Sequence, residues 1–150
     1  MWMSKKIFYS AGYFVLLFYI VFWAPWRKGV RLSEAERLRL HPITDTVKEL
    51  FNNHGGTWWT HAFYFCSNFF GNVIMFLPFS FVMMWVFNMK SVIKIALLAC
   101  LLSLTIEVTQ YYTGTGVADV DDVLLNTTGA VVGVYLCRFF QNHFKYFIHR

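Results

Sequence analysis

The chain reads VIKIALLACLLSLTIEVTQYY over residues 92–112. This apolar stretch has the length of roughly 20 residues that crosses the hydrocarbon core of a bilayer. It nevertheless contains one carboxylate, Glu107. A carboxylate at membrane depth is costly unless it faces protein or water, so its position predicts a functional site. Just beyond this stretch come Asp119, Asp121 and Asp122, so half of the eight acidic residues lie together.

Three further apolar runs accompany this one, at residues 7–23, 62–87 and 123–140. Hydrophobic residues make up 57% of the 150-residue chain and charged residues only 14%, against roughly 25% charged in soluble domains. The first run exceeds the ~7 to 15 apolar residues of a secretory signal, so we expect it to stay in the mature chain. The sequence therefore predicts an all-α integral membrane protein of one domain with four transmembrane helices.

Basic residues predict how these helices are oriented. The net charge of +5 is typical of juxtamembrane Lys and Arg and favours anionic lipid headgroups over nucleic acid as partner. With the amino terminus in the cytoplasm, seven of the 13 basic residues fall inside: Lys5, Lys6, Lys90, Lys94, Arg138, Lys145 and Arg150. We therefore expect both termini in the cytoplasm and the long first loop outside.

The long first loop has helical signals. Ser33 and Glu36 have the spacing of a capping box, and Leu38 and Leu40 can give a short helix an apolar side. A second helical segment is predicted at residues 44–51. Both helices are expected to lie on the membrane surface, either as an interfacial connector or as a lid over the acidic residues.

Polar residues of the third apolar run share one helical face. Ser103, Glu107 and Gln110 are spaced by four and three. Two asparagines of the second run, Asn68 and Asn72, are four apart and form a second stripe. These stripes are expected to meet near the outer surface of the membrane.

The fourth run contributes another stripe. Asp119, Asp122, Asn126 and Gly129 are spaced by three, four and three, and they share a face if a helix begins near Val120. A structural interpretation stands beside the functional one: Asp119 can cap this helix and the amides can join neighbouring helices. Gly129 and Gly133 form a GxxxG pattern, which predicts close helix packing.

Three blocks of the chain resemble the VanZ family. Residues 71–79 read GNVIMFLPF and resemble its glycine, asparagine, phenylalanine and proline signature. Residues 103–110, SLTIEVTQ, are similar to its serine, glutamate and glutamine helix, and residues 118–129, ADVDDVLLNTTG, to its aspartate-rich turn and following helix. With LHPI at residues 40–43, similar to a proline motif of the family's first loop, the resemblance spans about residues 39–135.

Two departures from the family pattern concern charge. Gly116 stands where many members have an arginine before the aspartates. Without it the aspartates have one internal partner fewer, which makes a cation or a cationic ligand more attractive. Arg39 stands where an asparagine often precedes the loop proline, and it can supply the missing charge.

The resemblance implies a bacterial cell-envelope protein whose family is known for resistance to teicoplanin, a lipoglycopeptide antibiotic. It implies no cofactor and no settled reaction. The first function class is a non-catalytic protein that binds a lipid-linked envelope precursor or a lipoglycopeptide at the outer leaflet. Its candidate ligand-binding residues are Ser103, Asn72, Gln110 and Asn126.

The second class is an intramembrane hydrolase or transferase that acts on a lipid-linked phosphate or sugar. Here Glu107, Asp119 and Asp122 are the candidate catalytic residues, with Glu107 as general acid or base. Asp119 and Asp122 are also candidate ligands of a divalent cation. A small ion-coupled transporter is a third class, but the chain has no internal repeat that would favour it.

Overall fold

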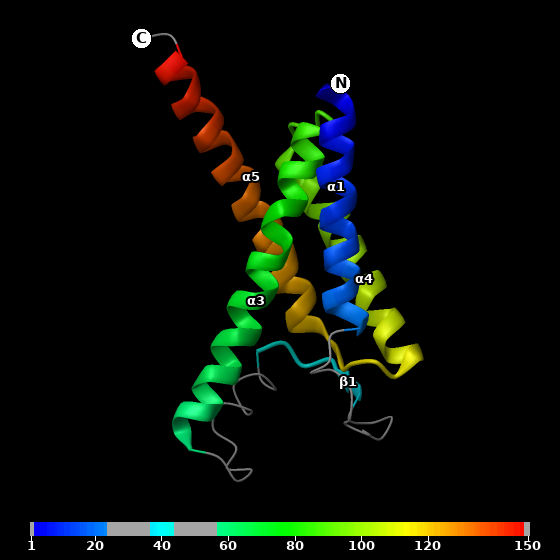
Figure 1. Ribbon diagram of the computed structural model, residues 1–150. Coiled ribbons are helices and arrows are strands. Elements are labelled where there is room, and N and C mark those ends of the chain that lie inside the picture. Colours follow the sequence, from blue (N-terminus) through cyan, green and yellow to red (C-terminus); the bar gives the residue numbers. More distant parts are fainter. Residues whose placement is uncertain (1, 24–36, 44–56, 149–150) are drawn as a thin grey trace.

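The computed structural model describes residues 2–23, 37–43 and 57–148. Long helices dominate it, and two short strands pair beside them (Figure 1). The elements in chain order are α1 (Trp2–Phe18), its π-helical continuation η1 (Tyr19–Trp23), β1 (Leu38–Arg39), α3 (Trp58–Trp85), α4 (Val92–Thr113), β2 (Ala118–Asp119) and α5 (Val120–Ile148).

Among the described residues, four helical stretches are long and apolar enough to cross a membrane: Lys5–Trp23, Trp58–Trp85, Val92–Thr113 and Val120–His143. They confirm the predicted four spans, with ends that differ from those of the apolar runs by a few residues. Large apolar side chains that the bundle leaves exposed, such as Leu97 and Leu101 on α4, are suited to contact with lipid. The protein is a multi-pass membrane protein.

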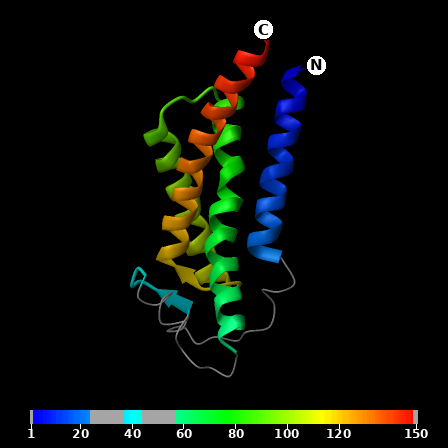
Figure 2. The ribbon, with the colours of Figure 1, turned by 90° about the vertical axis from the view of Figure 1, so that its left-hand side faces the viewer.

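Successive spans run in opposite directions, so both ends of the chain lie at the same end of the bundle (Figures 1 and 2). The turn from α4 into α5 and the start of α3 lie at the opposite end (Figure 1). Gly114 makes the α4 ending possible: it caps the helix in the left-handed conformation, φ 66°, which glycine adopts without a Cβ penalty. This turn positions the aspartates that follow it.

Helices α3 and α5 pack most closely, as the GxxxG pattern predicts. A Cβ placed on Gly129 would collide with the backbone carbonyl of Val73, and one on Gly133 would lie 2.6 Å from the carbonyl oxygen of Leu77. A buried polar contact also joins these helices near Gly133: the Ser80 hydroxyl donates to the Ala130 carbonyl at 2.5 Å. The two glycines therefore let the backbones of α3 and α5 approach.

The first loop differs from the sequence prediction where the structure describes it. Leu38 and Arg39 are extended rather than helical, and they pair in parallel with Ala118 and Asp119 of β2. The pairing satisfies main-chain groups that a helix would satisfy internally. The predicted helix at residues 44–51 lies outside the described residues, as does the capping box at residues 33–36.

Candidate functional site

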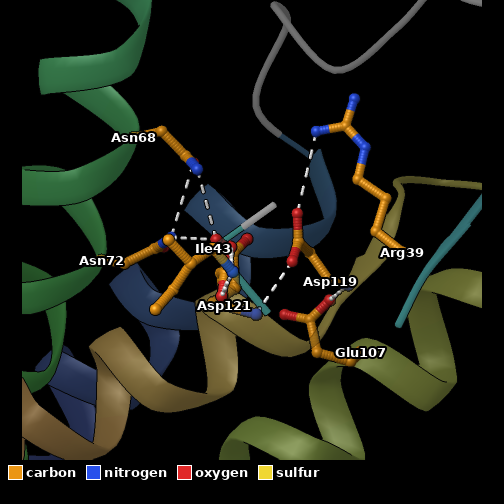
Figure 3. A network of polar contacts seen from close by, with 8 residues as sticks. Arg39, Ile43, Asn68, Asn72, Glu107, Asp119 and Asp121 are labelled. Atoms are coloured by element: carbon orange, nitrogen blue, oxygen red, sulfur yellow. Dashed lines mark hydrogen bonds and ion pairs between the residues drawn. The ribbon is translucent and has the colours of Figure 1, made fainter. Parts of the chain in front are cut away.

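Polar side chains from α3, α4, β2, α5 and the first loop gather around the start of α5 (Figure 3). Three of them are buried carboxylates: Glu107 is 5% exposed, Asp119 7% and Asp121 6%. Burial of this kind is rare unless each carboxylate has hydrogen-bond or ion-pair partners. The identity of these partners indicates the role of each carboxylate.

Glu107 connects α4 to the start of α5. Its Oε2 accepts a hydrogen bond from the main-chain N–H of Asp119 at 3.0 Å. Asp119 in turn accepts, through Oδ1, the N–H of Asp121 at 2.8 Å. This is the geometry of an N-cap, because Asp119 directly precedes the first residue of α5. The capping role predicted for Asp119 is therefore confirmed.

Arg39 lies over the same aspartate. Its Nη1 is 3.7 Å from Asp119 Oδ2, and the parallel pairing of β1 with β2 places the two residues opposite each other (Figure 3). The Arg39 side chain is 34% exposed, so water screens part of the attraction. The first loop thus supplies a cation beside Asp119.

Asp121 holds the end of the described first loop. Both of its carboxylate oxygens accept the main-chain N–H of Ile43, at 2.9 and 3.0 Å. Ile43 has φ 66°, and a β-branched residue in that region is strained. Strain of this type costs on the order of 1–3 kcal/mol, and the carboxylate contact helps to offset it. The sequence gives no signal of this contact, since nothing in residues 40–43 marks the backbone angle.

Asp122 connects α5 to α3. Its Oδ1 accepts the amide of Asn72 at 2.5 Å and the amide of Asn68 at 3.3 Å. The Asn72 amide also lies 3.4 Å from Asn68 Oδ1. The predicted meeting of the α3 stripe with the aspartates is therefore present, and Asn72 is buried within it.

The remaining predicted residues join helices elsewhere in the bundle. Asn126 donates to the Ser103 hydroxyl at 2.8 Å, and both side chains are buried between α4 and α5. Gln110 donates to the Val21 carbonyl of η1 at 3.1 Å. Asn126 Oδ1 is buried and has no hydrogen-bond partner among the described residues. These contacts give the amides a helix-joining role.

The aspartates predicted to hold a cation face different neighbours. Asp119 contacts Arg39 and caps α5, whereas Asp122 contacts the two asparagines of α3. Within residues 2–23, 37–43 and 57–148, no three or more His, Cys, Asp or Glu side chains are grouped so that they could hold a metal ion. The arrangement around Asp119 is that of an ion-paired helix cap.

A groove lies beside this network, between α1 and α3. Its volume is about 620 Å³, within the range of roughly 300–1,000 Å³ usual for small-molecule sites. Asn68 and Asn72 line it, so the side chains that contact Asp122 also border the groove. The groove was not predictable from the sequence. The apolar residues of α1 and α3 do not indicate which of their faces pack together and which leave space between the two helices.

Comparison with known proteins gives one match. A family model described as VanZ/LLP1 (VanZ-LLP1) matches residues 8–141, nearly the whole chain. No curated protein and no solved structure matches. The matched range includes all the polar residues of the network and the groove.

Proposed function

Because the chain belongs to the VanZ/LLP1 family, we propose that this multi-pass membrane protein binds a lipid-linked or lipidated molecule at the outer leaflet of a bacterial cell membrane. The observation that carries the proposal is the position of the Asn72–Asp122 contact. It lies at the first turn of α5 and near the middle of α3, and it borders a groove of ligand size. A polar group at one end of an apolar groove suits an amphipathic ligand.

Binding without catalysis agrees best with the contacts of the carboxylates. Glu107 is buried and accepts a main-chain N–H, and Asp119 caps a helix and pairs with Arg39. These contacts stabilise the turn between α4 and α5. A protein of this type can lower the access of a lipoglycopeptide such as teicoplanin to its target, as the family resemblance suggests.

An intramembrane hydrolase or transferase is the second candidate, and one observation favours it. Asp122 contacts two residues that line the groove, so its carboxylate is near the place where a ligand would lie. In such an enzyme Asp122 would meet the lipid-linked phosphate or sugar, and Glu107 with Asp119 would position it. General acid–base chemistry needs a carboxyl group within hydrogen-bond reach of the reacting atom.

Antibiotic susceptibility tests the proposal. Teicoplanin and vancomycin susceptibility would be measured in a sensitive Gram-positive host that expresses the wild type, Glu107→Gln or Asp122→Asn at matched membrane levels. Glutamine keeps an oxygen that can accept the Asp119 N–H, so a binding protein should retain teicoplanin protection in Glu107→Gln.

The outcomes separate the two candidates. Protection that Glu107→Gln retains supports binding without catalysis, and protection lost in Asp122→Asn alone would locate the ligand at the Asn72–Asp122 contact. Protection that disappears in both variants, with unchanged membrane levels, supports the enzyme. If the wild type gives no protection at all, the proposed role in glycopeptide resistance is wrong.

A further inference from the structure

The groove between α1 and α3 has a polar end and an apolar wall. Asn68 and Asn72 lie at the polar end, and Pro78 lines the groove farther along α3. The lining residues on α3 run from Tyr64 to Pro78, which is about 21 Å at ~1.5 Å per residue. That is about two thirds of the ~30 Å hydrocarbon core of a bilayer. Leu16, Leu17 and Ile20 of α1 line it from the other side.

Gly71 keeps the groove open. A Cβ built on this residue would meet no atom within 4 Å, whereas a Cβ on Gly129 or Gly133 would collide with α3. Helix packing therefore requires the two α5 glycines but does not require Gly71. Glycine inside a helix lowers stability by roughly 0.5–1 kcal/mol relative to alanine. Glycine occurs at such positions where, for example, a ligand closely approaches the backbone. Gly71 lines the groove, so a ligand there can approach the α3 backbone.

The apolar wall determines the kind of ligand. The groove borders two helices that are long and apolar enough to cross a membrane, so its contents come from the hydrocarbon of the bilayer. Its volume of about 620 Å³ and its position between two apolar helices suit one hydrocarbon chain. The apolar side chains of α1 would contact that chain along its length.

The polar end determines the headgroup. The amides of Asn68 and Asn72 line the groove, and each combines N–H donors with an acceptor oxygen. Each directs one N–H at Asp122 Oδ1, which orients the two amides. A sugar hydroxyl both donates and accepts hydrogen bonds, as these amides do, whereas an ionised phosphate only accepts them. The polar end therefore matches the hydroxyls of a sugar.

We infer that the groove between α1 and α3 seats the single hydrocarbon chain of a membrane glycolipid, with the sugar hydroxyls at Asn68 and Asn72. The inference rests on the proposed function and names the chain-binding part of the same site. It also assigns a role to Gly71, which is to leave room for the chain.

Photo-crosslinking tests the inference on the full-length protein in lipid nanodiscs. The probe is a dodecyl glucoside with a diazirine in its alkyl chain, and labelled peptides are mapped by mass spectrometry. The test variant is Gly71→Leu, which fills the groove. The matched control is Gly12→Leu on α1, because a Cβ at Gly12 also meets no atom within 4 Å and Gly12 does not line the groove.

In the wild type and in Gly12→Leu, labels should concentrate on the groove faces of α1 and α3. Gly71→Leu should reduce this labelling about tenfold, which corresponds to about 1.4 kcal/mol of binding. Equal labelling of Gly71→Leu and Gly12→Leu would overturn the inference. Labels spread evenly over the lipid-facing helices of the wild type would do the same.

A competition arm tests the headgroup. Unlabelled dodecyl maltoside should displace the probe at lower concentration than dodecyl phosphocholine, which has the same chain but no sugar. Equal displacement by the two would show that the polar end does not select hydroxyls, and that part of the inference would be wrong.

Susceptibility measured on the same variants separates this inference from the proposed function. If Gly71→Leu loses labelling but keeps teicoplanin protection, the groove binds a hydrocarbon chain but the proposed function is wrong. If Gly71→Leu keeps labelling while Asp122→Asn loses protection, the proposed function is supported. The hydrocarbon chain of the ligand then does not lie in the groove.

Discussion

Glu107 of α4 accepts a hydrogen bond from the main-chain N–H of Asp119, the residue that caps α5. A buried carboxylate therefore fixes where the last span begins. The same cap residue pairs with Arg39 from the first loop, so α4, α5 and that loop meet at one residue. Four predictions follow from this end of the bundle and from the helix packing beneath it.

Substitution of Glu107 should distinguish its acceptor role from its charge. Glu107→Ala leaves the buried Asp119 N–H without its partner, and we expect a loss of about 1–3 kcal/mol in unfolding free energy. Glu107→Gln keeps an acceptor oxygen and should lose clearly less. Thermal unfolding of both variants in the same detergent checks this order. Equal destabilisation by the two would mean that the negative charge, rather than the hydrogen bond, stabilises the turn.

Alanine substitution of glycines should have opposite effects at two positions. Gly129→Ala places a Cβ against the Val73 carbonyl, so α3 and α5 must separate, and we expect a lower melting temperature. Gly71→Ala adds a Cβ in open space and should leave stability unchanged or raise it by roughly 0.5–1 kcal/mol. A melting temperature that falls equally in both variants would contradict the packing described here.

Loss of the Asp121 carboxylate should free the described part of the first loop. Asp121→Ala removes both acceptors of the Ile43 N–H, so hydrogen–deuterium exchange at residues 37–43 should become faster. The control is Asp122→Ala, which removes a contact to α3 and should leave exchange in this segment closer to the wild type. Unchanged exchange in Asp121→Ala would show that the β1–β2 pairing alone holds the loop.

The Arg39–Asp119 ion pair should contribute little to stability, and its contribution should depend strongly on salt concentration. Its side chain is about one third exposed, so Arg39→Gln should cost no more than about 1 kcal/mol. The difference between wild type and variant should shrink as salt rises, because exposed charges are screened. Melting temperatures over a range of salt concentrations test this. A difference that is large and independent of salt would mean that the pair is shielded from water.

Helical periodicity made much of this site predictable. Ser103, Glu107 and Gln110 share a face because a helix repeats every 3.6 residues, and all three are buried. Their partners were harder to predict. Gln110 reaches η1, whereas Ser103 reaches α5, because one face of a helix meets different neighbours at different depths.

The first loop was the least predictable part. Leu38 and Leu40 can form the apolar side of a short helix, but a spacing of two fits an extended strand equally well. Leu38 and Arg39 are extended because β2 offers main-chain partners, and β2 is far away in the sequence. The sequence indicates that Arg39 can supply a charge to the aspartates, but only the strand register places it opposite Asp119.

The pairing of β1 with β2 also constrains how the protein is made. Ile43 and Asp121 are 78 residues apart, and two complete spans, α3 and α4, separate them in the chain. During synthesis β1 is translated first and has no partner until α4 has been inserted and the chain beyond it has reached the same side of the membrane. β1 therefore acquires its native pairing only late in biogenesis, and any chain that stops before Ala118 leaves this strand without its partner.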